Sequence, residues 1–320
     1  MSTKMLRKER WKEKPKTLNI AAGVPINGEF TFSRNTTKIM FDLQIAYTGN
    51  GETVSDYLAN IIRKIDIHNG DFNICQNMNG KDLLLHQWDL GRDVALGYVP
   101  PNVDQTEYVK RLVFGLPVKL SEQRKSTVKV KWRPVADVMG AANNTFTAIL
   151  QCWPNMIDYD PTCKDGGKPN TDYLRYQCDN WGDYADGAAF TQDIQKYRDG
   201  EQIRALMAYG STNGSYTTIP AFEEIYISDG DNAHIENMPN AVSRAIWEMN
   251  QRMHDQCEYT PEGTAPCAQF YKFTGFPANQ TNDIFGTIAA AMDDMRTVWL
   301  YEMGGYSSPR GKANLPRNDE

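Results

Sequence analysis

The sequence predicts an all-β chain of two tandem β-sandwiches with short helical insertions, and three observations carry this prediction. Short alternating segments follow one another between Gly and Pro turns, as in Gly28 to Phe32 and Lys38 to Tyr47. Helical periodicity is confined to a few short stretches. The third observation is an internal repeat at a spacing of 160 residues, which divides the 320 residues into two similar halves.

The repeat is clearest where an alternating segment runs into a Gly-Asp turn. The segment from Ile65 to Asp71 matches the segment from Ile225 to Asp231 without a gap. The same register aligns further identical residues: Asn77-Met78 with Asn237-Met238, Arg92 with Arg252, Pro101 with Pro261, and the Gly115-Leu-Pro117 turn with Gly275-Phe-Pro277. When residues 65–117 are aligned with 225–277, ten of the 53 positions are identical. Average residue usage would give roughly three identities by chance. We therefore expect two copies of one domain.

In the first half, alternation and turn residues predict a series of short strands. Besides the two segments named above and the strand at Ile65, they are expected at Val109 to Leu120, Thr127 to Trp132 and Thr145 to Trp153. Helical spacing predicts short helices over Val54 to Ile62 and Asp82 to Leu90.

The second half shows the same succession. Asn240 is expected to cap a helix whose apolar face carries Val242, Ile246, Met249 and Met253. Strands are expected at Phe190 to Tyr197, Gln202 to Tyr209 and Met295 to Tyr301. The segment from Pro154 to Asp186 is rich in Asp, Gly, Pro and Asn, and it is expected to join the halves.

These elements divide the chain into a basic N-terminal arm (1–24), a first sandwich (25–160), a second sandwich (161–305) and a flexible C-terminal tail (306–320). Sandwiches of roughly 140 residues are the right size for eight-stranded jelly rolls, and other β-sandwich topologies stay open at this point. Hydrophobic content of 41% and charged content of 23% are those of an ordinary globular chain. No segment has the roughly 18 apolar residues that a membrane-spanning helix requires.

Charge is distributed unevenly along the chain. The net charge is -6, yet the arm carries seven basic residues against Glu9 and Glu13, a local charge of about +5. The basic residues are Lys4, Arg7, Lys8, Arg10, Lys12, Lys14 and Lys16. Such an arm suits an anionic surface, either nucleic acid or phospholipid, and a solvated tail without a ligand is the alternative.

Catalytic and metal-binding patterns are missing from the sequence. The four histidines do not align with one another at the 160-residue offset, and neither a nucleophile elbow nor a phosphate-binding loop occurs. The six cysteines form no CxxC pair, so no cofactor or metal is expected; buried free thiols are the default, and a Cys163–Cys178 or Cys257–Cys267 disulfide stays open. We expect no enzyme activity.

Tandem jelly rolls, a basic arm and a repeated strand-turn-helix block resemble the double jelly-roll major capsid proteins of the tectivirus and adenovirus lineage. The resemblance rests on Tyr57 to Asp71 and Gly80 to Leu85, and in size it is closest to the bacteriophage members of corticovirus and finnlakevirus type.

The resemblance implies a structural protein that forms pseudo-hexameric homotrimers and tiles an icosahedral virion assembled in the host cytoplasm. Its partners would be itself, neighbouring capsomers, and penton and minor capsid proteins. The arm would contact internal membrane lipid or packaged genome. The alternatives are a secreted or surface carbohydrate-binding tandem sandwich and a jelly-roll glycan hydrolase.

Overall fold

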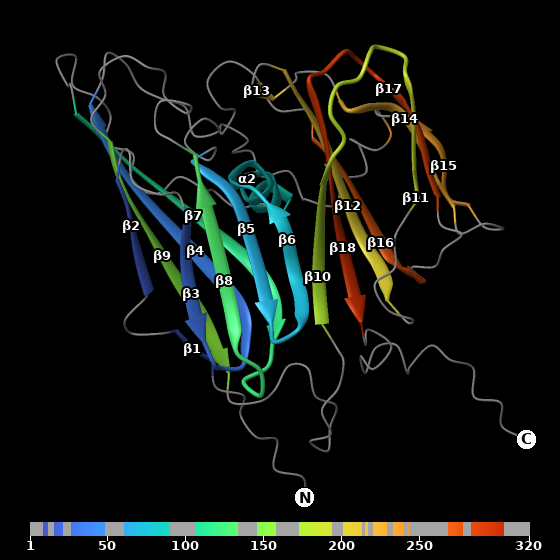
Figure 1. Cartoon of the computed structure of the whole chain (residues 1–320). Helices are drawn as coiled ribbons and strands as arrows, with labels where there is room; N and C mark the ends of the chain where they lie inside the picture. Colours follow the sequence, from blue (N-terminus) through green and yellow to red (C-terminus); the bar gives the residue numbers. More distant parts are fainter. Residues whose placement is uncertain are drawn as a thin grey trace, which may run out of the picture.

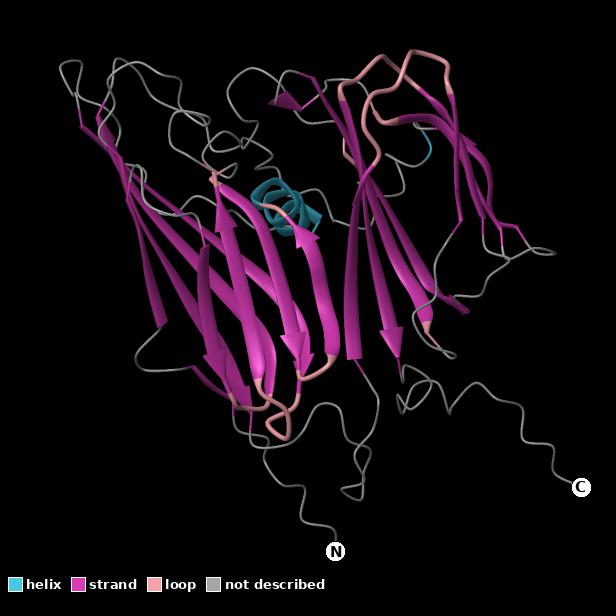
Figure 2. Ribbon diagram, viewed as in Figure 1, coloured by secondary structure: helices cyan, strands magenta, loops and turns pink. Residues whose placement is uncertain are grey.

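The computed structural model describes most of both halves of the chain (Figures 1 and 2). The described residues are 9–11, 16–21, 27–48, 61–89, 107–133, 146–157, 173–193, 201–212, 215–216, 220–228, 233–239, 242, 268–277 and 283–303. Within them the strands form sheets of five, nine and four strands. The middle sheet is shared by both halves of the sequence.

The first half contributes a five-stranded sheet and one end of the nine-stranded sheet. The five-stranded sheet consists of β1 (Glu9–Trp11), β2 (Lys16–Ala21), β9 (Phe146–Ile157), β4 (Thr36–Thr48) and β7 (Glu107–Leu120). Facing it lie β3 (Asn27–Phe32), β8 (Ser126–Trp132), β5 (Ile62–Asn69) and β6 (Phe72–Met78). The helix α2 (Gly80–Asp89) follows β6.

The second half contributes the rest of the nine-stranded sheet and the four-stranded sheet. Its part of the nine-stranded sheet consists of β10 (Tyr173–Asn180), β18 (Asp294–Met303), β12 (Gln202–Thr212), β16 (Gln269–Pro277) and the short β13 (Ser215–Tyr216). The four-stranded sheet consists of β11 (Ala189–Asp193), β17 (Asp283–Ile288), β14 (Phe222–Ser228) and β15 (Ala233–Pro239).

Both halves have the same strand order. Counting from β2 in the first half, the first, eighth, third and sixth strands lie side by side, and the second, seventh, fourth and fifth form the facing sheet. Counting from β10 and omitting β13, the second half repeats this order without change. This is the jelly-roll arrangement of eight antiparallel strands. The chain is therefore all-β with two tandem eight-stranded jelly rolls, as the sequence predicts.

The 160-residue repeat falls on equivalent elements. Ile65 and Ile67 of β5 correspond to Ile225 and Ile227 of β14, and all four side chains are fully buried. Gly70 lies between β5 and β6 with φ 62, which confirms the tight turn expected there. Its counterpart Gly230 lies outside the described residues.

Two expectations need correction. Gly115 to Pro117 lies inside β7 rather than in a turn, and the equivalent Gly275 to Pro277 ends β16, so the repeated Gly-x-Pro marks a strand. The expected connecting segment contains a complete strand, β10, because Tyr173 to Cys178 supplies buried side chains despite the polar surroundings. The first strand of the second jelly roll is therefore β10, which precedes the strand expected at Phe190.

The helix expected from Asp82 to Leu90 is present as α2, which begins two residues earlier. The expected helix over Val54 to Ile62 lies mostly outside the described residues, although Ile62 itself begins β5. Of the helix expected after Asn240, only Val242 is described, in a helical conformation. The C-terminal tail lies outside the described residues.

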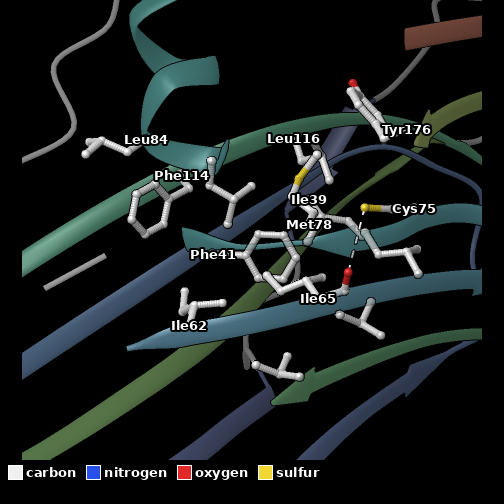
Figure 3. Close-up of a cluster of buried hydrophobic side chains, with 14 of the residues drawn as sticks. Ile39, Phe41, Ile62, Ile65, Cys75, Met78, Leu84, Phe114, Leu116 and Tyr176 are labelled. Atoms are coloured by element: carbon white, nitrogen blue, oxygen red, sulfur yellow. Dashed lines mark hydrogen bonds between the residues drawn. The ribbon is translucent and has the colours of Figure 1, made fainter. Parts of the chain in front are cut away.

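Each jelly roll has its own hydrophobic core. Figure 3 shows part of the first core, where side chains of β4 and β7 face those of β5 and β6; the labelled residues include Ile39, Phe41, Phe114, Ile65 and Met78. The second core is richer in aromatic residues and contains Phe190, Phe222, Tyr271, Trp299 and Tyr301. The first core continues onto the second jelly roll, because Tyr176, Met207, Tyr209 and Val298 belong to it.

Candidate functional site: the junction between the jelly rolls

The two jelly rolls are joined edge to edge through β6 and β10. These strands pair in parallel, with Cys75 opposite Tyr176 and Gln76 opposite Gln177, and this pairing makes one sheet out of two (Figure 1). Side chains from α2 and β7 then pack across the joint onto the outer face of β10, β18 and β12. The junction is therefore both a continuous sheet and a packed interface.

A buried carboxylate organises one end of the junction. Asn79 and Asp82 cap the start of α2 reciprocally: the Asp82 amide donates to the Asn79 side chain at 2.8 Å, and the Asn79 amide donates to the Asp82 carboxylate at 2.8 Å. This is the geometry of a capping box, with Asn and Asp in the two side-chain positions. Because Asp82 is fully buried, its remaining lone pairs need partners from elsewhere.

The second jelly roll supplies those partners. Arg296 of β18 donates to both carboxylate oxygens of Asp82, with Nη2 at 2.6 Å and Nε at 2.8 Å, and Tyr209 of β12 donates its hydroxyl at 2.8 Å. Arg296 also donates to the carbonyl of Asn77, the second-to-last residue of β6, which has a φ of 61. One carboxylate therefore connects a helix start with two strands of the other jelly roll.

Electrostatics fixes the charge states of this cluster. Burial by itself would lower the pKa of Arg296, but the adjacent Asp82 carboxylate outweighs it and holds that pKa well above its ordinary value. Burial, together with the Asp82 charge, raises the pKa of Tyr209, so its hydroxyl stays protonated and donates. The cluster therefore consists of an ion pair with a neutral donor at neutral pH.

A second ion cluster lies further along β18. Glu302 accepts from Lys119 of β7 at 2.7 Å and from Arg204 of β12 at 2.8 Å, so it too connects the two jelly rolls. Burial would raise the pKa of Glu302, but the hydrogen bond and charge of Lys119, with those of Arg204, lower it below its ordinary value. The three side chains are between 21% and 23% exposed.

The strip between the ion clusters is mainly apolar. Val298 is buried there, and the half-buried Leu300 packs against the first core. The Tyr176 hydroxyl donates to the Pro117 carbonyl across the joint at 3.0 Å. Burial, together with the neighbouring Cys75, raises the pKa of Cys178. Both thiols are free, which excludes the Cys163–Cys178 disulfide that the spacing left open.

The structure describes two of the seven basic arm residues. Arg10 lies in β1 opposite Met156, and Lys16 begins β2 opposite Cys152, so both strands extend the edge of β9. Lys4, Arg7, Lys8, Lys12 and Lys14 lie outside the described residues. The described part of the arm is thus paired with the five-stranded sheet rather than separate from it.

Chemistry-bearing clusters are sparse in the part of the chain that the structure describes. Its residues hold no group of three or more His, Cys, Asp or Glu side chains that could bind a metal ion. The buried Arg175–Glu201 pair is satisfied by Tyr173 and by stacking of Arg175 on Tyr301 at 3.9 Å, so it serves the second jelly roll structurally. Among the described helices, none is long and apolar enough to cross a membrane.

The likeness to known proteins lies in the fold. No protein-family model matches the sequence, and no curated protein matches it. The STIV MCP, from Sulfolobus Turreted Icosahedral Virus, superposes with a TM-score of 0.65 at 12% identity over 94% of this chain and 97% of its own. The PBCV-1 virus capsid gives a TM-score of 0.58 at 10% identity, covering 93% and 95%.

The major capsid protein P2 from bacteriophage PM2 gives a TM-score of 0.52 at 11% identity over 93% of this chain and 97% of its own. All three similarities extend over both jelly rolls, so the double jelly-roll architecture is common to the whole length of each chain. At this level of identity they establish the fold.

Sequence reasoning missed the junction. The Asn79-x-x-Asp82 spacing was a readable signal for the start of α2, because paired side chains three residues apart cap helices. The partners of Asp82 gave no such signal, since Tyr209 and Arg296 are 127 and 214 residues away.

Proposed function

We propose that this protein is a major capsid protein: a structural, non-enzymatic subunit that assembles as a homotrimer and tiles an icosahedral virion shell. One observation carries the proposal. Two jelly rolls of identical strand order are joined through one continuous sheet, and the pair resembles three viral capsid proteins over at least 93% of this chain. Penton and minor capsid proteins would be its other partners.

The junction supports this role physically. Three chains arranged around a threefold axis place six similar jelly rolls around a ring, provided that each chain holds its two domains at a fixed angle. The Asp82 and Glu302 clusters fix that angle at two separate points. A closer relation of this chain to the bacteriophage members of the lineage is a proposal from its size alone, because the TM-score is higher for the Sulfolobus virus protein than for PM2.

The solution mass of the full chain tests the proposal. Light scattering is expected to give about three times the chain mass of 36.3 kDa, and negative-stain images should show hexagonal outlines. A stable monomer that binds oligosaccharide or cleaves a glycan would replace the capsid role by one of its alternatives.

We further propose that the basic arm binds an anionic surface, either internal membrane lipid or packaged genome, without reading sequence. Deleting the arm (residues 1–24) would be a poor test, because it would remove both β1 and β2. Substituting the five arm residues outside these strands by Gln keeps both strands; they are Lys4, Arg7, Lys8, Lys12 and Lys14.

A matched control removes five exposed charges elsewhere in the first jelly roll: Arg63, Lys125, Lys129, Lys131 and Arg133. The arm variant should lose affinity for anionic vesicles or for DNA. With DNA, the slope of log K against log salt concentration should become less steep by about 0.9 for each lost phosphate contact. If the arm variant and the control lost the same affinity, the net charge of the chain would explain the binding, and a specific role of the arm would be contradicted.

A further inference from the structure

The two jelly rolls carry a β-bulge at equivalent positions of β5 and β14. Arg63 is the extra residue in β5 and Lys64 follows it, and the register of the pairing with β8 shifts at this point. Glu223 is the extra residue in β14 and Glu224 follows it, with the same shift in the pairing with β17. The 160-residue register aligns the two bulges residue by residue. One bulge therefore presents two cations, and its counterpart presents two carboxylates.

The backbone beside the two bulges is equivalent as well. The Arg133 amide donates to the Ile61 carbonyl at 2.9 Å, and the Ala289 amide donates to the Ala221 carbonyl at 3.2 Å. Ile61 and Ala221 are again related by the 160-residue register, so β8 corresponds to β17. The reversal of charge is therefore a difference between side chains on one shared backbone arrangement.

The outer face of β3, β5 and β8 is the basic face of the chain. Strand alternation turns its side chains away from the first core, because Ile62, Ile65 and Ile67 of β5 are fully buried. The face carries five basic side chains against two carboxylates, an excess of three positive charges. The basic residues are Arg63, Lys64, Lys129, Lys131 and Arg133, and the carboxylates are Glu29 and Asp66.

The outer face of β11, β14 and β17 is the equivalent acidic face. These three strands contain neither Lys nor Arg. Glu223 and Glu224 are exposed, and Phe285, in the position equivalent to Lys129, is 42% exposed. Tyr226 lies beside Phe285 with the ring centroids 6.1 Å apart. Carboxylates beside exposed aromatic rings attract cations, both by charge and by the quadrupole of the rings.

We propose that these two faces bind each other between copies of the chain, so that the basic face of one chain docks on the acidic face of a chain in a neighbouring trimer. The inference rests on the proposed capsid role and names the surfaces by which one homotrimer holds the next. The two faces lie in different halves of the molecule, so each chain can offer both (Figure 1). Complementary charge commits each face to the other, because two basic or two acidic faces in contact would repel.

The reversal of charge gives this contact its specificity. Because both jelly rolls have the same strand order, shape alone would let a first jelly roll meet either kind of neighbour. The charges leave only the contact between unlike faces, through repulsion in the wrong pairing as well as attraction in the right one. A duplicated domain thereby gains two distinct binding faces without a change of fold.

Exchanging the charges in the full chain tests the contact. Glu223→Lys/Glu224→Lys places cations on both faces, and Arg63→Glu/Lys131→Glu reverses the excess charge of the basic face. Either variant should form trimers that associate with one another at least roughly 10-fold more weakly than wild-type trimers. Sedimentation velocity at low ionic strength measures the association, and circular dichroism checks the fold. The variant that combines both exchanges should recover most of the association, because its faces are complementary again.

Asp183→Lys/Asp186→Lys is the matched control, with the same change of net charge as Glu223→Lys/Glu224→Lys. Both aspartates are exposed in the loop between β10 and β11, outside the three strands of the acidic face. This control should associate like the wild type. Raising the salt concentration to about 0.5 M should weaken the association of wild-type trimers, because the contact is formed by exposed charges.

The outcomes separate this contact from the capsid role. A wild-type chain that remains monomeric would overturn the homotrimer and the contact together. Wild-type trimers that do not associate at low salt, or whose association is unchanged in both exchange variants, would overturn the contact alone. Exchange variants that become folded monomers would place these faces inside the trimer, against the proposal. If Arg63→Glu/Lys131→Glu lost binding to anionic vesicles or DNA but kept the association of trimers, the basic face would serve that anionic surface instead.

Discussion

Two ion clusters hold the jelly rolls together, and they differ in burial. Arg296 and Glu302 lie six residues apart on the same face of β18, a separation of about 20 Å at the rise of a β-strand. The Asp82 side chain is 0% exposed and Arg296 is 11% exposed. Glu302 and both of its partners are each more than 20% exposed.

The difference separates two kinds of contribution. A buried ion pair adds little net stability over a well-packed apolar pair, yet removing one partner is costly because the other charge stays buried. A partly exposed ion pair is screened by water and salt, so its formation or loss changes the free energy of unfolding only slightly. We infer that the Asp82 cluster determines which orientation of the jelly rolls is allowed, and that the Glu302 cluster adjusts its stability.

Arg296→Met should have the largest effect on the junction. It leaves the Asp82 carboxylate without its cation, and we expect a loss of about 3 to 5 kcal/mol in the free energy of unfolding. Urea denaturation followed by fluorescence and by circular dichroism measures this loss. The double variant Asp82→Leu/Arg296→Met should recover most of it, and a double variant as unstable as the single one would contradict the explanation by an unpaired charge.

Tyr209→Phe should have an intermediate effect. The Tyr209 hydroxyl donates to a carboxylate, and a hydrogen bond to a charged group is worth about 1.5 to 3 kcal/mol. Tyr176→Phe is a matched comparison across the same joint, because the Tyr176 hydroxyl donates to the neutral Pro117 carbonyl and its loss should cost about 1 kcal/mol. If Tyr176→Phe destabilised the protein more than Tyr209→Phe, the junction would not depend chiefly on the Asp82 charge.

Local pattern was enough to predict the strands and the two tandem sandwiches, but it left their topology open and could not predict their junction. The alternation around Ile65 and Phe41 reports the inward face of a half-buried strand, and these residues are fully buried. Gly115 to Pro117 was misread because Gly and Pro are typical of turns, whereas here they lie within the long strand β7. The packing of β7 against β4 outweighs the low strand propensity of both residues.

Strand β10 was missed for a related reason. The segment around β10 is polar overall, and its buried apolar side chains are only Tyr173, Tyr176 and Cys178. Tyr176 and Cys178 are buried against the first jelly roll, a contact that local sequence does not encode. The same holds for Arg296, whose pattern along β18 reads as an ordinary solvent-facing position until α2 is placed over it.

Glu302→Gln should have the smallest effect and should reveal the half-exposed character of its cluster. Because Lys119 and Arg204 lower the pKa of Glu302 in the folded protein, its contribution is present above the unfolded pKa of about 4.3 and is lost as the pH falls through the lower folded value. At pH 7 the variant should lose less than about 1 kcal/mol, and 0.5 M salt should shrink the difference from wild type. Below the folded pKa of Glu302 the two proteins should be equally stable, since the wild-type carboxyl is then protonated. A difference that does not shrink as the pH falls from 7 into the acid range would show that the substitution disturbs packing rather than charge, and the contrast between the two clusters would then lose its electrostatic basis.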